Sequence, residues 1–488
     1  MHLSKLTNHL PSFTIQNDAD PFIHSLHMDH REVAAGSLFF CIKGYTVDGH
    51  DFAEKAVANG AVALVAEKEL DVSVPVVIVR SSKRAMAVMS SFFYDFPTAK
   101  LKLIGVTGTN GKTTTTHLID KILRDSGRKT GIIGTMYTKY LDKEIPVKNT
   151  TPESLVLQQH FSKMVTEGVE TVAMEVSSHA LVQGRVHGTQ FDIAVFTNLS
   201  QDHLDFHGTM ENYAQAKGLL FAQLGNGYHP ANQPFAVLNV DDNVHLQLET
   251  MTAAPILTYG IHREADMMAS DVQIDERGAA FTMTLGEEHV RVTMPMTGMF
   301  SVYNALAASS AAYLSGVSLQ AIAASLSATS GVSGRFERVE VNQPFHVIVD
   351  YAHTPDSLEN VLRTIREFAK GRISVVVGCG GDRDKTKRPV MASIAGKLAD
   401  YVYLTSDNPR SEDPLAILQD MEQGMSGSDY KVIVDRKEAI YEAIRHAETD
   451  EVVLIAGKGH ETYQTIGGVN HHFDDRLVAK EAVKECRT

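Results

Sequence analysis

The chain has 488 residues, which is too long for one hydrophobic core and suggests about three domains at roughly 150 residues each. Its 45 Lys and Arg residues stand against 59 Asp and Glu residues, so the formal net charge is −14. A negative chain with no Trp and no basic run argues against binding to nucleic acid or to an anionic membrane surface. A small anionic substrate is still compatible with this charge, because a local cationic site can exist inside a negative protein.

The three cysteines, Cys41, Cys379 and Cys486, stand far apart and show no C-x-x-C spacing. Neither a disulfide framework nor a zinc site is therefore indicated. Residues 1–13 lack the apolar core of a signal peptide, and no apolar run reaches the ~18 residues of a membrane span. We expect a cytoplasmic protein that does not insert into a membrane.

Short β-branched runs alternate with helical patterns along most of the chain, which is typical of parallel sheets covered by helices. In the first hundred residues we predict strands at 37–42, 61–66 and 74–79 and helices at 52–59 and 83–96. Pro97 and the residues up to 100 predict a linker.

A second α/β unit begins with a predicted strand at 101–106, a Gly/Thr loop and a helix at 113–126. Further along we predict strands at 171–176, 193–197 and 236–239 and a helix at 210–224. Residues 269–296 alternate like antiparallel strands with a turn at 276–278, and two Ala-rich helices follow and end near Gly331.

The third unit repeats strand and helix, with predicted strands at 345–350, 373–377, 401–405, 431–434 and 452–455. This pattern indicates a doubly wound sheet, in which ligands bind beyond the carboxyl ends of the strands. Asp350, Gly378, Asp407 and Gly457 all follow such ends directly. The fold class is therefore α/β with three units.

The segment GTNGKTT connects the strand at 101–106 to the helix at 113–126, which is the setting of a phosphate-binding loop. Lys112 could reach the β- and γ-phosphates, and the Thr113 hydroxyl could coordinate Mg²⁺. One glycine of the commonest spacing is absent, since Val106 and Thr107 occupy that region. The alternative is an ordinary glycine-rich turn, which the strand–loop–helix context disfavours.

Polar side chains at the ends of two other predicted strands could ligate a Mg²⁺ ion that is held mainly by phosphate oxygens and water. Glu175 ends one strand, and Asp202 and His203 follow another. Taken alone, His203 is more often a hydrogen-bonded structural histidine, and Lys217 on its helix would ordinarily be solvated.

The third unit carries polar loops at three strand ends, with Arg383, Arg410 and Glu461 among their residues. Two guanidinium groups at one rim suit bidentate recognition of a carboxylate, and Glu461 could meet an amine. The alternative interpretation of each of these loops is an ordinary polar surface loop without a binding role.

These motifs together resemble the Mur ligases. The matching segments, in chain order, are GTNGKTT at 108–114, EVSSH at 175–179, NLSQDHLDFH at 198–207, YAQAK at 213–217, GMFSVYNALAA at 298–308, SGRFE at 333–337 and DYAHTP at 350–355. The resemblance spans nearly the whole chain and is greatest to the branch that adds the third amino acid of the peptide. DNPR at 407–410 is similar to the version that adds meso-diaminopimelate rather than L-lysine.

The resemblance implies three domains: an N-terminal α/β UDP-binding domain at 1–98, a central P-loop ATPase-like parallel-sheet domain at 99–331, and a C-terminal Rossmann-like domain at 332–488. It also implies an ATP-dependent amide ligase of peptidoglycan precursor synthesis. ATP would phosphorylate the D-glutamyl side-chain carboxylate of UDP-MurNAc-L-Ala-D-Glu, and the amine of meso-diaminopimelate would attack the acyl phosphate. We expect a monomer whose substrates are small molecules.

The resemblance carries site residues over position by position. Glu175 and His203 match magnesium ligands, and Lys217 matches a lysine that CO₂ converts to a carbamate (N6-carboxylysine), which helps hold a second Mg²⁺. The predicted ATP site comprises Gly108, Thr109, Asn110, Gly111, Lys112, Thr113, Thr114, Asn304, Arg335 and Asp350. The predicted UDP-MurNAc-dipeptide site comprises His30, Asn149, Thr150, Thr151, Ser177, Gln183 and Arg185. The predicted meso-diaminopimelate site comprises Arg383, Asp407, Asn408, Pro409, Arg410, Gly457 and Glu461.

Diaminopimelate is lysine with one more carboxylate, which Arg410 and Arg383 could pair with. Lysine would leave these guanidinium groups partly unpaired, and an unpaired polar group rejects an analogue better than shape does. The chain departs from the family at His30, which follows Asp29 where the family usually shows Ser-Arg, and at Ser333, where a proline is common. The alternatives are a lysine-adding relative, a folylpolyglutamate synthetase-like ligase, and a P-loop module that only hydrolyses nucleotide.

Overall fold

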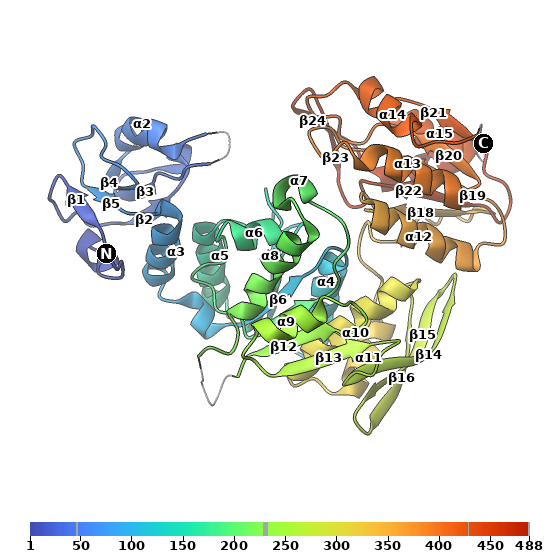
Figure 1. The fold of residues 1–488 in the computed structure, drawn as a ribbon, viewed down its shortest axis with the longest axis horizontal. Helices are drawn as coiled ribbons and strands as arrows, with labels where there is room; N and C mark the ends of the chain where they lie inside the picture. The colour runs from blue at the N-terminus through green and yellow to red at the C-terminus, as the bar shows by residue number, and fades with distance from the viewer. Residues whose placement is uncertain (45–46, 228–232, 428, 487–488) are drawn as a thin grey trace. The chain divides into compact units, whose positions relative to one another are not determined.

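The computed structural model of the chain describes residues 1–44, 47–227, 233–427 and 429–486 (Figure 1). Two units are distinguished by their internal contacts. Unit 1 comprises Met1–Gly105, Arg128–Ala194 and Asn226–Pro234, and unit 2 comprises Val106–Gly127, Val195–Gly225 and Phe235–Thr488. None of the helices in the described ranges combines the length and the apolar character needed to cross a bilayer.

The first sheet lies in unit 1 and has the order β1-β5-β4-β3-β2. Its strands are β1 (Thr14–Gln16), β2 (Ser25–His27), β3 (Ser37–Phe40), β4 (Ala61–Ala66) and β5 (Val76–Ile78). Its helices are α1 (Leu3–Thr7), α2 (Ala53–Ala58) and α3 (Ser82–Phe93), with 3₁₀ turns at His30–Glu32, Gly49–Phe52 and Pro97–Lys100. The three predicted strands and two predicted helices of this region are confirmed, whereas β1 and β2 were not predicted.

Helices cover both faces of this sheet because successive side chains of a strand point to opposite sides. Leu38 and Phe40 of β3 belong to the cluster that packs against α1 and α3. Phe39 lies in a second cluster with Ala53 and Ala56 of α2. Every residue of β3 is therefore buried, as expected for a strand inside a parallel sheet.

Among the described residues the second sheet has eleven strands in the order β16-β15-β14-β13-β12-β11-β6-β10-β7-β8-β9. The strands are β6 (Lys102–Thr107), β7 (Thr130–Ile133), β8 (Thr138–Tyr140), β9 (Lys143–Ile145), β10 (Thr171–Glu175), β11 (Ile193–Phe196), β12 (Phe235–Asn239), β13 (Ile256–Gly260), β14 (Met267–Asp275), β15 (Gly278–Leu285) and β16 (Glu288–Met294). The helices are α4 (Lys112–Asp125), α5 (Ser154–Thr166), α6 (Ser178–Val182), α7 (Leu204–His207), α8 (Met210–Ala222), α9 (His245–Met251), α10 (Met299–Leu314) and α11 (Leu319–Ser327).

The predicted antiparallel segment at 269–296 is confirmed as the meander β14-β15-β16, with its first turn after Asp275. The residues of the predicted linker, 97–100, have a regular structure. These residues form a 3₁₀ turn that packs against α5, and Pro97 and Thr98 are buried. The Thr98 hydroxyl accepts a hydrogen bond from the Gln190 N–H, which ties the turn to the body of unit 1.

The third sheet lies in unit 2 and has the order β17-β18-β22-β19-β20-β21. Its strands are β17 (Glu337–Arg338), β18 (His346–Asp350), β19 (Ile373–Val377), β20 (Tyr401–Leu404), β21 (Tyr430–Val432) and β22 (Val452–Ala456), and a separate hairpin is formed by β23 (Tyr463–Ile466) and β24 (Val469–His472). Its helices are α12 (Pro355–Phe368), α13 (Lys387–Leu398), α14 (Pro414–Glu422), α15 (Arg436–Arg445) and α16 (Asp475–Glu485). All five predicted strands are confirmed.

This sheet is doubly wound, as predicted. Strands β18 to β22 pair in parallel, and β17 alone is antiparallel. Val375 and Leu454 face the cluster of α12, α13 and α14. Val376 and Ile455 face the cluster of α15 and α16. The alternation along each strand thus assigns the helices to two covering layers. The parallel pairing of the strands brings the loops after β18, β19, β20 and β22 to one edge.

Helices α15 and α16 are joined by an ion pair that is fully buried. Arg436 and Asp475 each have no exposed side-chain surface, and the Arg436 Nη2 and Nε atoms donate to the two carboxylate oxygens at 2.7 and 2.8 Å. Arg436 also donates to the backbone carbonyls of Ala456 and Ser406, at the ends of β22 and β20. The neighbouring pair Lys437–Glu481 joins the same two helices at the surface, at 3.5 Å.

We predict that Asp475→Asn destabilises this part of the chain by about 3–5 kcal/mol, because it removes the carboxylate that pairs directly with the buried Arg436 cation. Glu481→Gln breaks the exposed pair between the same helices and should change little, since surface pairs contribute weakly. Thermal unfolding of both variants tests this. Equal transition midpoints for the two variants would contradict the assignment of stability to the buried pair.

Candidate functional site

The glycine-rich segment at 108–114 forms a loop between β6 and α4, which is the strand–loop–helix context predicted from the sequence. The Thr109 and Asn110 N–H groups donate to the main-chain and side-chain oxygens of Asn198, at 2.8 and 2.9 Å. Gly111 has φ 85° and lies so close to Asn304 Oδ1 that a side chain would clash there. The Lys112 ammonium donates to the carbonyls of Gly108 and Thr109, at 2.9 and 2.8 Å.

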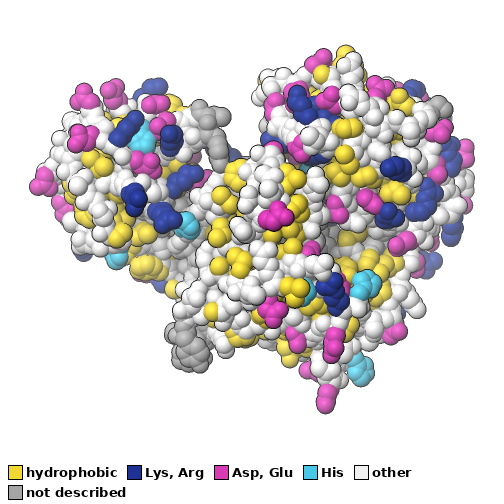
Figure 2. Space-filling view, in the orientation of Figure 1, with side chains coloured by type: hydrophobic (Ala, Val, Ile, Leu, Met, Phe, Trp, Pro, Cys, Tyr) yellow, Lys and Arg dark blue, Asp and Glu magenta, His cyan; other side chains and the backbone are white. Residues whose placement is uncertain are grey.

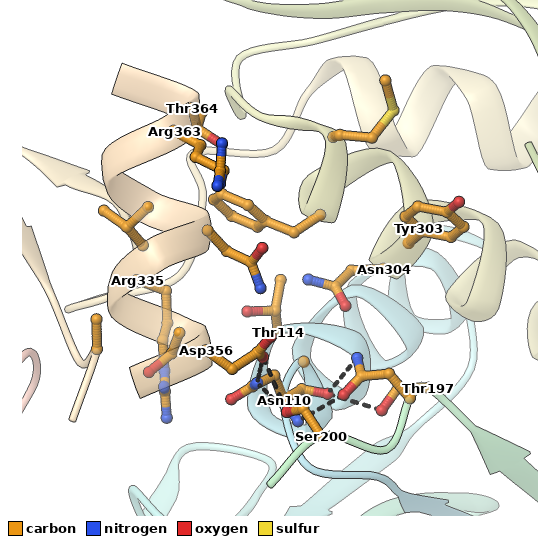
Figure 3. Close-up of a pocket in the computed structure, with 18 of the residues that line it drawn as sticks. Asn110, Thr114, Thr197, Ser200, Tyr303, Asn304, Arg335, Asp356, Arg363 and Thr364 are labelled. Atoms are coloured by element: carbon orange, nitrogen blue, oxygen red, sulfur yellow. Dashed lines mark hydrogen bonds between the residues drawn. The ribbon is translucent and has the colours of Figure 1, made fainter. Parts of the chain in front are cut away.

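A cavity of about 520 Å³ opens beside this loop within unit 2 (Figure 3). Predicted nucleotide residues from distant parts of the chain line it together. They are Asn110, Gly111, Thr114, Asn304, Arg335 and Asp350. The loop contributes one side of the cavity, while α10 and α12 contribute Asn304 and Asp356.

Asp356 was not among the predicted site residues. Arg335 was predicted for the ATP site, but the sequence did not indicate the contacts that it makes here. Asp356 Oδ2 accepts hydrogen bonds from Asn110 Nδ2 at 2.7 Å and from the Ser200 hydroxyl at 2.9 Å. Arg335 stacks 4.3 Å from the centre of the Tyr351 ring and donates from Nη2 to Thr113 Oγ1 at 3.0 Å. Segments that are more than two hundred residues apart in the chain thus meet at the phosphate loop.

Asp350 ends β18 with a buried carboxylate that accepts the Phe336 N–H at 2.7 Å. Burial raises the pKa of Asp350 above its usual range, although Arg335 and the Phe336 and Ala352 N–H groups oppose this. The carboxylate is therefore held in a fixed position at the cavity wall.

Lys217 lies on α8 with only 1% of its surface exposed, so the ordinary expectation of a solvated lysine is wrong. Its Nζ lies 4.1 Å from the centre of the Tyr213 ring, and no hydrogen bond or ion pair from a described residue reaches it. Burial lowers the pKa of Lys217 well below its usual range, Lys112 lowers it further, and Asp202 opposes the shift. The neutral amine is thereby favoured more than in a solvated lysine.

His203 caps α7 in a left-handed conformation with φ 54°. Its Nε2 lies 3.3 Å from Asp202 Oδ2. Burial raises the pKa of Asp202, but His203, His353 and Lys387 together outweigh it and hold this pKa below its usual range. No three His, Cys, Asp or Glu side chains within the described ranges form a ready metal site. A divalent ion would thus need oxygen ligands from phosphate, water or a modified lysine, in addition to groups such as His203.

In unit 1, Glu175 ends β10 fully buried, and its carboxylate accepts the Thr135 N–H and hydroxyl at 2.8 and 3.0 Å. Predicted dipeptide residues adjoin this strand end. The Thr151 hydroxyl donates to the Glu175 carbonyl at 2.9 Å and accepts the Ser177 N–H at 3.0 Å. Arg185 Nη1 donates to the Thr151 carbonyl at 3.0 Å.

The remaining predicted dipeptide residues fall into two groups. The Thr150 and Thr135 hydroxyls lie 3.1 Å apart, and Gln183 Oε1 accepts a hydrogen bond from Arg185 Nε at 3.1 Å. Thr150 and Gln183 therefore belong to the same network. Asn149 precedes Thr150 in the sequence and is exposed. His30 instead stacks on Phe52, with ring centres 4.4 Å apart. No hydrogen bond, ion pair or ring contact between described residues joins His30 to the Thr151 group.

Three loops of the third sheet meet where the amino-acid site was predicted. Arg410 Nη1 donates to the Gly381 carbonyl at 2.6 Å. A methyl group at Gly380 would lie 2.7 Å from Arg410 Nη1 and 3.8 Å from Arg383 Cγ, so both arginines border this glycine. Asn408 Nδ2 donates to Glu461 Oε2 at 2.9 Å. Asp407 borders Gly457 in the same way, because a methyl group there would lie 2.6 Å from Asp407 Oδ2.

The hairpin β23–β24, which the sequence did not predict, completes this region. The Arg410 N–H donates to the Thr465 carbonyl at 3.0 Å, and the Gly467 N–H donates to the Arg410 carbonyl at 2.7 Å. Arg410 has φ 53°, a left-handed conformation that these two bonds hold. Lys458 was also missed, although a lysine between two glycines directly after a strand is a signal that could have drawn attention to it.

The face drawn in Figure 2 carries acidic and basic side chains interspersed rather than in one continuous field. Cationic groups of the site regions, such as Lys112 and Arg410, instead lie partly or largely covered among strand-end loops.

Three family models match the chain: "Mur ligase family, catalytic domain" over residues 22–94, "Mur ligase middle domain" over 106–312, and "Mur ligase, glutamate ligase domain" over 334–459. The UDP-N-acetylmuramoyl-L-alanyl-D-glutamate--2,6-diaminopimelate ligases of Halalkalibacterium halodurans and Bacillus cereus are 59% and 57% identical to it. The aligned region covers 99% of this chain in both cases, and 99% and 98% of the relatives. A solved structure of a ligase of that name is 35% identical with a TM-score of 0.69 and coverage of 99% of both chains. With this identity along nearly its whole length, the chain belongs to the Mur ligase family.

Proposed function

We propose that this chain joins meso-2,6-diaminopimelate to the D-glutamyl side-chain carboxylate of UDP-MurNAc-L-Ala-D-Glu, consuming ATP and releasing ADP and phosphate. The product is the UDP-MurNAc-tripeptide of peptidoglycan precursor synthesis. Relatives at 57% and 59% identity carry the name of this ligase. The observation that carries the proposal is the meeting of Arg383, Arg410 and Glu461 at one edge of the third sheet, where two cations and an anion match the distal end of diaminopimelate.

The first step is transfer of the γ-phosphoryl group of ATP to the substrate carboxylate, which gives an acyl phosphate and ADP. Both reacting groups are negative, so charge neutralisation is the main demand on the site. Lys112 and the N–H groups of the loop at 108–114 other than those of Thr109 and Asn110, which bond to Asn198, meet this demand in our proposal. Asn304, Arg335 and Asp350 bind the remainder of the nucleotide, which is consistent with their place around one cavity.

We assign Thr113, Glu175, His203 and Lys217 as the metal-binding residues, with Lys217 converted to a carbamate by CO₂. Bound Mg²⁺ supplies Lewis-acid neutralisation of the phosphate oxygens. A neutral amine is the form that reacts with CO₂, and the depressed pKa of buried Lys217 supports that form. The resulting carboxylate would also replace an unfavourable cation beside Lys112 by a favourable anion.

In the second step the amine of diaminopimelate attacks the acyl-phosphate carbon, and the tetrahedral intermediate collapses to the amide with loss of phosphate. Arg383 and Arg410 orient the substrate through its distal carboxylate, and Glu461 through its distal amine. Thr151, Ser177 and Arg185, with Asn149, Thr150 and Gln183, are proposed to bind the UDP-muramoyl peptide, and His30 its uridine end. Positioning two reactants in one geometry is the remaining source of rate.

We further propose that three domains, at 1–98, 99–331 and 332–488, supply these groups. The three matched family segments fall inside these ranges, which supports the boundaries. We also propose that the protein is a monomer in the cytoplasm, where ATP and the small-molecule substrates are found.

Replacing Lys217 by Ala should lower kcat at least about 100-fold, because the carbamate ligand is lost. A short carboxylic acid such as formate should restore part of the activity by supplying the missing carboxylate. The exposed Lys484, replaced by Ala, is the matched control and should leave kcat unchanged. Full activity of Lys217→Ala without any additive would remove the carbamate from the mechanism.

Replacing Arg410 by Ala should raise the KM for diaminopimelate about thirtyfold, or ~2 kcal/mol, through loss of a charge-assisted pair. The KM for ATP should stay within about twofold, because Arg410 is absent from the cavity beside the phosphate loop. Arg445→Ala, on the exposed side of α15, is the control. An unchanged KM for diaminopimelate in Arg410→Ala would take this residue out of the amino-acid site.

A further inference from the structure

Lys458 is a charged side chain that the reaction scheme above does not use. It follows β22 between Gly457 and Gly459, and its side chain has no exposed surface. A lysine is rarely buried unless it is paired, because removing an ammonium from water is costly. The hydrogen bonds of the Lys458 ammonium group indicate its role.

Lys458 closes a triangle of hydrogen bonds with two predicted amino-acid-site residues. Its Nζ donates to Glu461 Oε2 at 3.0 Å and to Asn408 Oδ1 at 3.1 Å, and Asn408 Nδ2 donates to Glu461 Oε2 at 2.9 Å. The three residues come from the loops after β20 and β22, so the triangle joins two of the three loops at this edge.

The amide of Asn408 is committed to this framework. Its Oδ1 also accepts the Thr465 N–H at 2.9 Å, so the hairpin β23–β24 is tied to the same atom. Glu461 Oε2 receives two hydrogen bonds within the triangle, whereas its Oε1 takes part in none of them. The carboxylate is thereby fixed in orientation, with one oxygen left outside the framework.

Glu461 is surrounded by groups that favour its negative charge and by others that oppose it. Burial raises the pKa of Glu461, Asp407 raises it further, and Lys458 and the Asn408 amide oppose the shift. The groups that face it are Lys458, Asp407, the buried Arg436 cation and the hydroxyls of Tyr351 and Tyr463. Lys458 is the only cation among them that makes a hydrogen bond to the carboxylate within the described residues.

We propose that Lys458 is a positioning residue of the amino-acid site, which keeps Glu461 ionised and aimed for the ammonium group of the incoming amino acid. The inference rests on the proposed function, since it assumes that Glu461 binds that ammonium group. Lys458 contributes through Glu461 and Asn408 rather than by touching the substrate.

Replacing Lys458 by Met removes the cation and retains most of the apolar volume. Without it, Glu461 lies beside Asp407 and takes up a proton at a higher pH than in the wild type. A protonated Glu461 attracts an ammonium group weakly, so the variant loses affinity for diaminopimelate as the pH falls, and does so earlier than the wild type. The KM ratio of variant to wild type cancels the titration of the substrates themselves.

The test is the KM for meso-diaminopimelate at saturating ATP and UDP-MurNAc-L-Ala-D-Glu, in wild type, Lys458→Met, Lys458→Arg and the exposed control Lys480→Met. We expect the Lys458→Met ratio to grow several-fold from about pH 8.5 to about pH 6, because each unit by which the variant raises the pKa of Glu461 can lower its ionised fraction at most about tenfold. Lys458→Arg retains the cation and should show a nearly flat ratio, and Lys480→Met should stay near one. The KM for ATP should not change in any of them.

A ratio for Lys458→Met that is raised equally at every pH would overturn the proposal, since it indicates lost packing rather than lost charge. If this variant does not fold, the same profile in Lys458→Gln gives the answer. Failure of the proposed function itself is recognised separately, because the wild type would then not turn over diaminopimelate at any pH.

Discussion

Parallel strands end at the same edge of a sheet, and the chemistry of this chain depends on that constraint. In the third sheet the loops after β18, β19, β20 and β22 converge although they are up to about a hundred residues apart in the chain. The convergence places Asp350 on the cavity beside the loop at 108–114 and Arg383, Arg410 and Glu461 in the neighbouring loops. The strand ends therefore determine where these loops begin, and the contacts between the loops determine where their polar side chains lie.

Two buried lysines illustrate how surroundings assign different roles to one side chain. Lys217 is buried against an aromatic ring, and its burial and the charge of Lys112 lower its pKa well below the usual range, a setting that favours the carbamate we propose. Lys458 instead meets the carboxylate of Glu461 and the amide oxygen of Asn408, which stabilise its charge. Composition alone, or the position of a lysine after a strand or within a helix, could not distinguish these cases, since the difference comes from residues distant in sequence.

Much of the fold could be predicted because long apolar strands and helices carry strong periodic signals. The five parallel strands of the third sheet are four or five residues of mostly buried apolar side chains, apart from the shorter β21, and all were predicted. Strands β1 and β2 are only three residues long, and all four residues of β24 are exposed, so none shows a clear alternation. The turn at 97–100 looked like a linker because Pro97 is locally ambiguous, and only packing against α5 makes it part of the body.

The sequence could indicate which residues belong to the candidate site, but not the hydrogen bonds that join them. The loop at 108–114 was identifiable since glycines, a lysine and the adjoining elements all agree. The contacts of Asp356 with Asn110 and Ser200, and of Lys458 with Asn408, depend on tertiary structure that sequence spacing does not encode. The left-handed conformation of Arg410 likewise follows from its pairing with β23 rather than from its residue type.

The central claim is that turnover requires an amino acid with a second carboxylate for the two arginines. The most direct measurement is release of ADP with UDP-MurNAc-L-Ala-D-Glu in three parallel reactions: with meso-diaminopimelate, with L-lysine, and with neither. The account predicts rapid ADP release with diaminopimelate and little in the other two reactions. Equal rates with lysine would contradict the role of the arginines, and equal rates without any amino acid would indicate a nucleotide hydrolase instead of a ligase.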